Sequence, residues 1–371
     1  MSELKGIYIE DVIEQGKRYS DLLSKKGKLS VESMLAPVPM NVETIIDKRP
    51  DLILVDYVLT RKQPNGQMAT YKGGTLASNI RELYPNHPIV LVTRRVLLEE
   101  SGGAPGQLGP FDTKFFKDEI RADRNRSIRV LVALASGYEK LRQAIPLTWP
   151  KILRALGAEA QEAEDINETK PKGQISSATT TNIATWSVPE IARWILDALF
   201  AFPGVFYDDL FAATTLGLSV QSLSKQGIES ALSKARYDGV FGDMDRRWWH
   251  GRLLSQAFDI VRKAGLKPPL SKSFVPAVKK ALKIEAPPSK CVYSGKPFAD
   301  TVCCVLRKPV LRQYSLSYFP DNRPKVMDEA RVSFSAFRNQ GFHEEFLNSE
   351  GLHLYQELRR GAKHKSRKHS K

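Results

Sequence analysis

Four short apolar runs lie within the first 120 or so residues, and each is followed directly by a polar side chain. The runs are residues 6–9, 52–55, 89–92 and 115–116. The polar residues that follow them are Glu10 with Asp11, Asp56, Thr93 and Lys117. A short continuous apolar run bounded by polar residues is typical of a strand buried on both faces of a parallel sheet. The pattern therefore predicts parallel strands that each end in a polar group.

In an open parallel α/β sheet, the carboxyl ends of the strands open on one crevice, where ligands bind. The carboxylates of Glu10, Asp11 and Asp56 would repel one another there unless a hard cation such as Mg²⁺ neutralised them. The ammonium group of Lys117 and the hydroxyl group of Thr93 suit the oxygens of a phosphoryl group. The sequence therefore predicts a site that places phosphate on Asp56.

Residues 1–145 resemble the receiver domain of two-component response regulators, which carries these types of polar residue after its strands in this order. The resemblance implies a doubly wound α/β fold with a five-stranded parallel sheet. Leu59 matches the apolar position three residues after the phosphoacceptor of that family. Gly74 matches the glycine that opens the following helix.

The same resemblance assigns a role to each polar residue at the strand ends. Glu10, Asp11 and Asp56 are expected to hold Mg²⁺ as the cofactor. Asp56 is expected to accept a phosphoryl group from a histidine kinase or another phosphodonor. Thr93 and Lys117 are expected to bind the phosphoryl oxygens, which completes the catalytic set.

The chain also departs from the family pattern around this site. Asp118 follows the lysine where the family usually has proline, and Arg94 follows the hydroxyl residue where a small side chain is usual. The loop over residues 61–73 is longer than typical, and a glycine-rich segment, residues 100–110, replaces much of the fourth helix. These differences leave an alternative open, in which a degenerate receiver binds a protein partner without phosphate.

Farther along the chain, apolar residues at helical spacing predict a helix over residues 125–142 and a shorter one over residues 151–156. From Gly157 to about residue 185 large apolar side chains are scarce, which is typical of a linker. We therefore divide the chain into a receiver-like domain, a short helix with a flexible linker, a helical domain, a small β-rich or α+β module and a basic disordered tail. Their ranges are 1–145, 146–185, 186–286, 287–358 and 359–371.

The helical domain weakly resembles a winged helix-turn-helix. Its predicted helices cover residues 191–202, 210–216 and 220–236, and residues 237–241 are placed for the start of a wing. Ala213, Gly217 and Leu223 fall at the small, glycine and apolar positions of such a motif. The candidates for contact with nucleic acid are Ser219, Gln221, Ser222, Lys225, Arg246 and Arg247. Contact with a protein partner and a plain helical core are the alternatives for this element.

The composition is that of a soluble globular protein, with 42% hydrophobic and 26% charged residues over 371 positions. No apolar stretch approaches the ~20 residues that cross a bilayer, so no membrane partner is expected. The start lacks a secretory pattern, which predicts a cytoplasmic protein. Cys291, Cys303 and Cys304 lack the paired spacing of a structural zinc site and are expected to be buried apolar residues.

Positive charge is concentrated after residue 150, where 34 Lys and Arg face 23 Asp and Glu, within a total net charge of +15. This balance favours a phosphate-bearing partner for the second half of the chain. We find no nucleotide-binding glycine loop or common hydrolase motif, so we do not expect an enzyme. The sequence predicts a response-regulator-like protein with a basic output region that binds nucleic acid. The alternative is a protein–protein adaptor or regulatory subunit in a larger stress or defence assembly.

Overall fold

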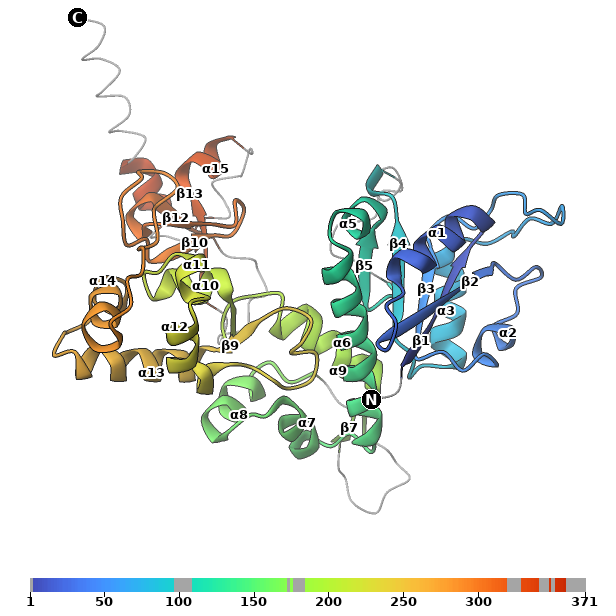
Figure 1. Cartoon of the computed structure of the whole chain (residues 1–371), viewed down its shortest axis with the longest axis horizontal. Coiled ribbons are helices and arrows are strands. Elements are labelled where there is room, and N and C mark those ends of the chain that lie inside the picture. The colour runs from blue at the N-terminus through green and yellow to red at the C-terminus, as the bar shows by residue number, and fades with distance from the viewer. Residues whose placement is uncertain are drawn as a thin grey trace, which may run out of the picture. The chain divides into compact units, whose positions relative to one another are not determined.

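The computed structural model describes residues 3–96, 109–171, 174–175, 184–318, 328–339, 347 and 351–357 (Figure 1). The chain forms two compact units, and each unit is assembled from several stretches of sequence. The first unit comprises Met1–Glu159, Pro171–Ala198 and Asp238–Asp245. The second unit comprises Ala160–Lys170, Leu199–Tyr237 and Arg246–Lys371.

The first unit is built on a five-stranded sheet in which all neighbouring strands are parallel. The strands are β1 (Leu4–Glu10), β2 (Leu29–Leu35), β3 (Leu52–Asp56), β4 (Ile89–Thr93) and β5 (Thr113–Phe116). Their order across the sheet is β2-β1-β3-β4-β5. This is the doubly wound order in which the crevice lies at the carboxyl ends of β1 and β3. The predicted fold class of the N-terminal domain is therefore confirmed.

Helices cover this sheet because successive strand residues point to opposite faces. The helices are α1 (Ile13–Leu23), α2 (Glu43–Ile46), α3 (Gly73–Leu83), α5 (Lys117–Ala122) and α6 (Arg124–Gln143). Ile7, Ile53 and Ile89 pack on one face with Leu76 and Ile80 of α3. The predicted helix over residues 125–142 corresponds to α6, whose first turn is capped by the side chain of the preceding aspartate.

A buried polar network connects α3, β4 and α6 within this unit. The carboxylate of Asp112 accepts hydrogen bonds from Arg81 at 2.7 Å, from the Tyr138 hydroxyl at 2.6 Å and from the Ile89 amide at 2.7 Å. Arg81 also donates to the carbonyls of Pro85, His87 and Pro110. The Asp112 side chain is fully buried, so these donors replace the water that a carboxylate requires.

A distant stretch of sequence returns to pack on α6. A Cβ atom on Gly137 would lie 2.1 Å from the ring of Phe241, so this close contact requires glycine. The Phe241 ring also packs against Tyr138, with ring centroids 6.3 Å apart. Asp245 forms an ion pair with Arg126 at 3.1 Å. Residues 238–245 are therefore part of the first unit and form no wing, contrary to the predicted helix-turn-helix.

The segment predicted as a flexible linker contains regular structure. Helix α7 (Trp149–Leu156) ends at Gly157 as expected, and α8 (Ala160–Asn167) follows it. Ile152 and Ile166 are fully buried, although the surrounding sequence is poor in large apolar residues. The short strands β6 (Gln174–Ile175) and β7 (Ala184–Thr185) also lie in this segment, and α9 (Val188–Arg193) and the π-helix η1 (Trp194–Leu199) follow it.

The second unit contains a helical layer around one apolar core. Its elements in this region are β8 (Phe206–Asp208), α10 (Asp209–Thr215), α11 (Val220–Leu223), α12 (Gln226–Ala231), the 3-10 turn η2 (Ser233–Ala235), β9 (Arg247–Trp249), α13 (His250–Lys263), α14 (Leu270–Ala277) and the π-helix η3 (Val278–Leu282). Strands β8 and β9 pair antiparallel. Trp248 and Trp249 are both buried in β9.

The single recognition helix expected over residues 220–236 is wrong, and the helix-turn-helix is not confirmed. The structure divides this stretch into α11, α12 and η2, with Lys225 in an extended conformation between the first two. Leu223 and Ile228 are both fully buried. On an unbroken helix, residues five positions apart point about 140° away from each other, so the break lets both reach the core.

The end of the chain forms the predicted β-rich module. Its sheet has the order β11-β10-β13-β12 and contains both antiparallel and parallel pairs. The elements are β10 (Thr301–Cys303), β11 (Lys308–Val310), the turn η4 (Arg312–Tyr314), β12 (Ser315–Tyr318), β13 (Ala330–Ser333) and α15 (Phe334–Asn339). Cys291 and Cys303 are buried in its apolar core, as expected from their sequence context, whereas Cys304, also expected to be buried, is only partly buried against it. The basic tail 359–371 and most of the glycine-rich segment 100–110 lie outside the described residues.

None of the described helices is long and apolar enough to cross a bilayer.

Candidate functional site

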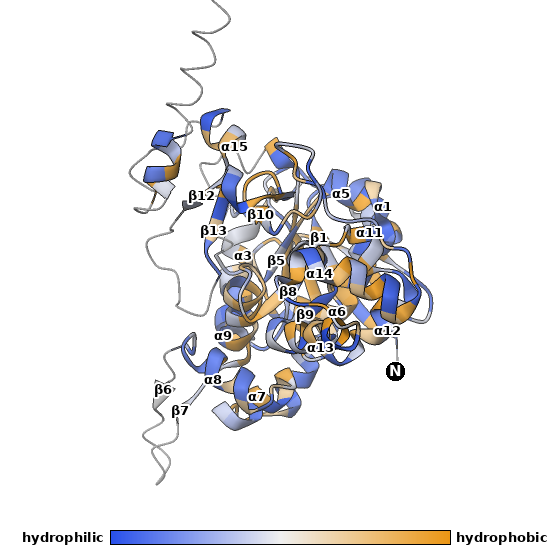
Figure 2. Cartoon of the chain, turned by 90° about the vertical axis from the view of Figure 1, so that its left-hand side faces the viewer, coloured by the Kyte–Doolittle hydropathy of each residue, from blue (hydrophilic) through white to orange (hydrophobic). Residues whose placement is uncertain are grey.

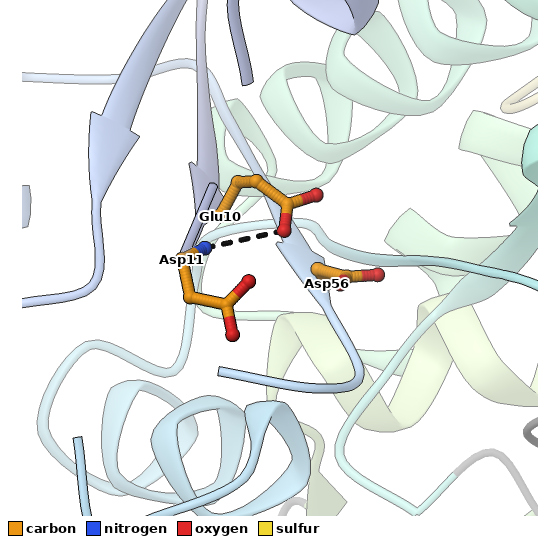
Figure 3. A group of neighbouring side chains, drawn as sticks. All are labelled: Glu10, Asp11 and Asp56. Atoms are coloured by element: carbon orange, nitrogen blue, oxygen red, sulfur yellow. Dashed lines mark hydrogen bonds between the residues drawn. The ribbon is translucent and has the colours of Figure 1, made fainter. Parts of the chain in front are cut away.

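Three buried carboxylates meet at the carboxyl edge of the sheet. Glu10 and Asp56 are the last residues of β1 and β3, which are neighbours, and Asp11 follows Glu10 (Figure 3). One carboxylate oxygen from each of the three lies within 4.8 Å of the others. The residues are only 2%, 1% and 5% exposed, respectively. The predicted cluster is therefore assembled in the fold.

Lys117 provides the positive charge of this cluster. It is the first residue of α5 and follows β5 directly. Its Nζ atom lies 2.7 Å from Glu10 Oε2 and 3.2 Å from Asp56 Oδ1, and it also donates to Gln15. The ammonium group sits over the ring of Tyr19. Lys117 therefore connects the carboxylates at the ends of β1 and β3.

Glu10 and Asp11 each accept a further hydrogen bond, and two polar atoms at the site have no partner in the described part of the chain. The Tyr8 hydroxyl donates to Glu10 at 2.8 Å, and the amide of Arg61 donates to Asp11 Oδ2 at 2.7 Å. Asp11 Oδ1 and Thr93 Oγ1 are buried without a hydrogen-bond partner among the described residues. A buried polar atom without a partner is rare in a native fold and often marks the place of an ion or ligand.

Burial shifts the protonation of this cluster. Desolvation, together with the nearby Glu10 carboxylate, raises the pKa of Asp56 to about 7, although Lys117 opposes the shift. Desolvation and the hydrogen bond with Glu10 raise the pKa of Asp11 to about 6. Burial also acts on Glu10, but the Lys117 ammonium group outweighs it, and the pKa of Glu10 is lowered. The cluster thus holds more negative charge than one lysine can balance.

Asp56→Asn is expected to raise the stability of the metal-free chain at about pH 8. The folded-state pKa of Asp56, about 7, exceeds its ordinary value of 3.8. At pH values between 3.8 and about 7, the folded state binds more protons than the unfolded state, so the stability of the fold decreases as the pH rises. Above pH 7 the full cost of burying the ionised Asp56 carboxylate is present. Asparagine buries no charge, and the variant should gain ~1–3 kcal/mol.

Urea denaturation in the presence of a chelator, at about pH 5 and about pH 8, measures this difference. The native chain should lose more stability between the two conditions than the variant. Asp11 titrates in the same range and is unchanged in both chains, so a residual slope is expected in the variant. Equal losses in the two chains would contradict the raised pKa of Asp56.

A glycine allows α3 to begin against the end of β3. A Cβ atom on Gly73 would lie 2.0 Å from the carbonyl oxygen of Asp56, whereas one on Gly74 would meet nothing within 4 Å. The resemblance assigned the glycine that opens this helix to Gly74. In the structure, Gly73 opens α3 and is the glycine that the close contact requires. Leu59 is fully buried in the apolar core beneath, as the resemblance implied.

The long loop after β3 is fixed to its surroundings by specific contacts. Gln63 is buried and donates to the carbonyl of Ala36 at 2.7 Å. The hydroxyl of Tyr71 donates to the carbonyl of Pro37. With the Arg61 amide on Asp11, these contacts hold the loop beside the carboxylates. Arg94, which follows Thr93, is exposed.

Sequence reasoning missed three groups at the site: Tyr8 and the Arg61 amide, which donate to the carboxylates, and Gln15, which accepts from Lys117. Tyr8 was recognisable in principle because residues two apart on a strand point to the same face. Gln15 and Arg61 reach the site from a helix and a loop, where spacing along the chain gives no comparable signal.

The candidates for nucleic-acid contact do not form one exposed surface. Ser222 is buried and donates to the Pro287 carbonyl, and Ser219 caps the same helix. Arg246 pairs with Asp209 and Glu229. Gln221 and Lys225 are exposed, but the Lys225 ammonium group donates to a backbone carbonyl.

Arg247, the last of these candidates, is partly buried and lies over the ring of Phe200 at 4.8 Å from the ring centroid. It therefore belongs to a packed aromatic region of the second unit.

No family model matches the sequence, and no curated protein matches it. Among solved structures, the receiver domain of the putative response regulator NarL from Mycobacterium tuberculosis is 16% identical, with a TM-score of 0.27; the match covers 37% of this chain and 99% of that one. The isolated receiver domain of RcsB from Salmonella enterica serovar Typhimurium is 13% identical, with a TM-score of 0.28, over 37% and 91% of the two chains. A receiver protein from Sinorhizobium medicae is 18% identical, with a TM-score of 0.25, over 36% and 97%.

These likenesses concern the N-terminal part of the chain and are too distant to carry a function. The sheet order of the first unit and the polar residues at its strand ends carry the assignment of the fold. The N-terminal part of this chain is a receiver-like α/β domain.

Proposed function

We propose that this protein is a response-regulator-like signalling protein whose N-terminal domain accepts a phosphoryl group on Asp56 in the presence of Mg²⁺. The observation that supports the proposal most is the convergence of three buried carboxylates with Lys117 at one sheet edge. The phosphorylated domain then controls a basic output region that binds nucleic acid. The charge excess after residue 150 supports the second step.

The residues present fit a bound magnesium ion. Mg²⁺ is held in proteins by one or two carboxylates with water and phosphate oxygens, and Glu10, Asp11 and Asp56 offer such oxygens within 4.8 Å of one another. Asp11 Oδ1 has no hydrogen-bond partner among the described residues and is available as a ligand atom. When bound, the ion supplies positive charge that balances the carboxylates and the incoming phosphoryl oxygens.

The chain's own groups have distinct roles in the transfer. An oxygen of the Asp56 carboxylate forms a bond to phosphorus, and the bond from phosphorus to the donor's leaving group breaks with its electron pair. The product is an acyl phosphate on Asp56. Lys117 already lies 3.2 Å from Asp56 Oδ1 and balances charge on the phosphoryl oxygens, while Thr93 Oγ1 donates a hydrogen bond to one of them.

Incubation with acetyl phosphate and Mg²⁺ is expected to add one phosphoryl group to the native chain. Intact mass measures the adduct, and peptide mapping places it on Asp56. Asp56→Asn should give no adduct, and Lys117→Gln should give much less. Lys114→Gln is the matched control, since this partly exposed lysine lies on the neighbouring strand β5. An adduct of equal yield in Asp56→Asn would overturn the assignment.

A second function is favoured by one observation, which is the burial of the acceptor. Asp56 is only 5% exposed, and Glu10 and Asp11 are already engaged by Tyr8, Lys117 and the Arg61 amide. A receiver-like domain that binds a protein partner without phosphate fits this arrangement. Absence of any adduct at saturating acetyl phosphate, with a melting temperature that does not respond to Mg²⁺, would favour this function over phosphorylation.

A further inference from the structure

Within the described part of the second unit, positive charge is densest on the helical hairpin of α13 and α14 with the π-helix η3. Between residues 260 and 284 the sequence contains seven Lys and Arg and no Asp or Glu. All seven basic side chains are exposed. They are Arg262, Lys263, Lys267, Lys272, Lys279, Lys280 and Lys283.

Three of these seven charges have partners within the fold. Arg262 pairs with Asp259 at 2.8 Å, and Lys279 pairs with Glu285 at 2.7 Å. Lys280 donates to the carbonyl of Ala264 at the end of α13. The other four have no ion pair or side-chain hydrogen bond among the described residues. These four, Lys263, Lys267, Lys272 and Lys283, are called the open lysines below.

The apolar sides of the two helices are already used by the core of the second unit. Leu253, Ala257 and Val261 of α13 and Phe274 and Ala277 of α14 are buried in it. The ribbons of both helices show hydrophilic and hydrophobic colours (Figure 2). The face that remains outside is therefore cationic, and Phe258, at 43%, is the large apolar side chain exposed on it in the described part of this hairpin.

The backbone conformation of Lys283 is a second observation that supports a functional role for this cationic surface. It ends the π-helix in the left-handed region, with φ of +59°, where glycine is the residue without steric cost. A side chain in this conformation costs ~1 kcal/mol or more, and such positions concentrate at functional sites. The π-helix that it ends is a rare form that is frequently found at functional sites.

We infer that the hairpin of α13 and α14 binds the sugar–phosphate backbone of double-stranded nucleic acid. The inference rests on the nucleic-acid output of the proposed function and assigns that output to a surface. Lysine ammonium groups bind phosphates as point charges and carry no base specificity, so binding is expected to be independent of sequence.

Two other anionic partners fit this surface less well. Peripheral helices that bind anionic membranes insert an apolar face, but the apolar faces of α13 and α14 are buried in the core. Single-stranded nucleic acid is usually held by exposed aromatic side chains on which bases stack. Phe258 alone fills that description among the described residues of the hairpin. An exposed cationic face suits the regular phosphates of a duplex.

The test measures binding of the full-length protein to a duplex of arbitrary sequence at several salt concentrations. In one variant the open lysines are replaced together, as Lys263→Gln, Lys267→Gln, Lys272→Gln and Lys283→Gln. The logarithm of the affinity should depend on the logarithm of salt with a slope that is smaller by ~3–4 in this variant. Its affinity near physiological salt should fall on the order of 100-fold.

The matched control removes the same charge from the first unit. Lys17, Lys25, Lys26 and Lys28 are exposed there, and their joint replacement by Gln lowers the net charge equally. This control should change the affinity little. Equal losses in the two quadruple variants would overturn the inference, because net charge alone would then explain the binding.

A single replacement separates charge from folding. Lys283→Gly removes one open lysine and also relieves the left-handed strain, so the thermal stability should be unchanged or higher. The salt slope should nevertheless fall by ~1. A native slope in this variant, together with native affinity in the quadruple variant, would overturn the inference.

The remaining outcomes distinguish the inference from the function on which it rests. If the full-length protein fails to bind a duplex even at low salt, the proposed nucleic-acid output falls and the inference falls with it. If the protein binds a duplex but the open lysines contribute nothing, only the inference fails. Binding of vesicles rich in phosphatidylserine, without binding of duplex, would identify a membrane surface and overturn the inference.

Discussion

Asp112→Ala is expected to destabilise the first unit by about 3–5 kcal/mol, the range observed when one partner of a buried ion pair is removed. The carboxylate of Asp112 accepts from Arg81, Tyr138 and the amide of Ile89, and its side chain is fully buried. Alanine leaves a guanidinium group that is only 13% exposed without its counter-charge. The loss is large because burial denies the guanidinium group full hydration.

Urea denaturation followed by far-ultraviolet circular dichroism measures this effect. Tyr138→Phe removes one hydrogen bond to the same carboxylate and should cost only ~1 kcal/mol. Asp21→Ala, at an exposed position of α1, should be close to neutral. If Asp112→Ala costs no more than Tyr138→Phe, the network is not a stabilising unit of the fold.

Gly73→Ala is expected to cost about 3 kcal/mol and to reduce phosphorylation of Asp56, because the new methyl group has no space. Its Cβ atom would lie 2.0 Å from the carbonyl oxygen of Asp56, so either β3 or the start of α3 must move. A shift of β3 displaces the carboxylate that is proposed to accept the phosphoryl group. Stability and acetyl phosphate labelling are therefore expected to fall together.

Gly74→Ala provides a matched control one position along the chain. A Cβ atom there meets nothing within 4 Å, and Gly74 lies within the first turn of α3. Alanine favours a helix over glycine by up to about 1 kcal/mol, so this variant should be as stable as the native chain or slightly more so. Similar losses in the two variants would show that the tight packing at Gly73 is not the cause.

The sequence was most informative about the residues at the carboxyl ends of the parallel strands. Each polar residue after an apolar run, such as Asp56 or Thr93, lies at the predicted sheet edge because parallel strands place their ends together. The role of glycine was assigned one residue late because spacing alone cannot show which of Gly73 and Gly74 touches the Asp56 carbonyl. That distinction depends on how α3 packs.

The structure of the region after residue 186 was harder to predict from the sequence, for a physical reason. Leu223 and Ile228 were compatible with one helix by composition, and only the shared core explains why the chain breaks between them. The run of basic residues over 262–283 was visible in the sequence. Which of those charges already have partners depends on contacts such as that between Lys280 and Ala264, which the sequence does not specify.

The packing of Phe241 on Gly137 has a consequence for how this protein can evolve. In a protein whose two units each occupy one continuous stretch of sequence, recombination at a single point can exchange either unit whole. Here the first unit includes Pro171–Ala198 and Asp238–Asp245 as well as the N-terminal stretch. A recombination event after Glu159 or Ala198 would separate Phe241 from Gly137, and one after Asp245 would separate Leu199–Tyr237 from the rest of the second unit. The two units are therefore constrained to be inherited together.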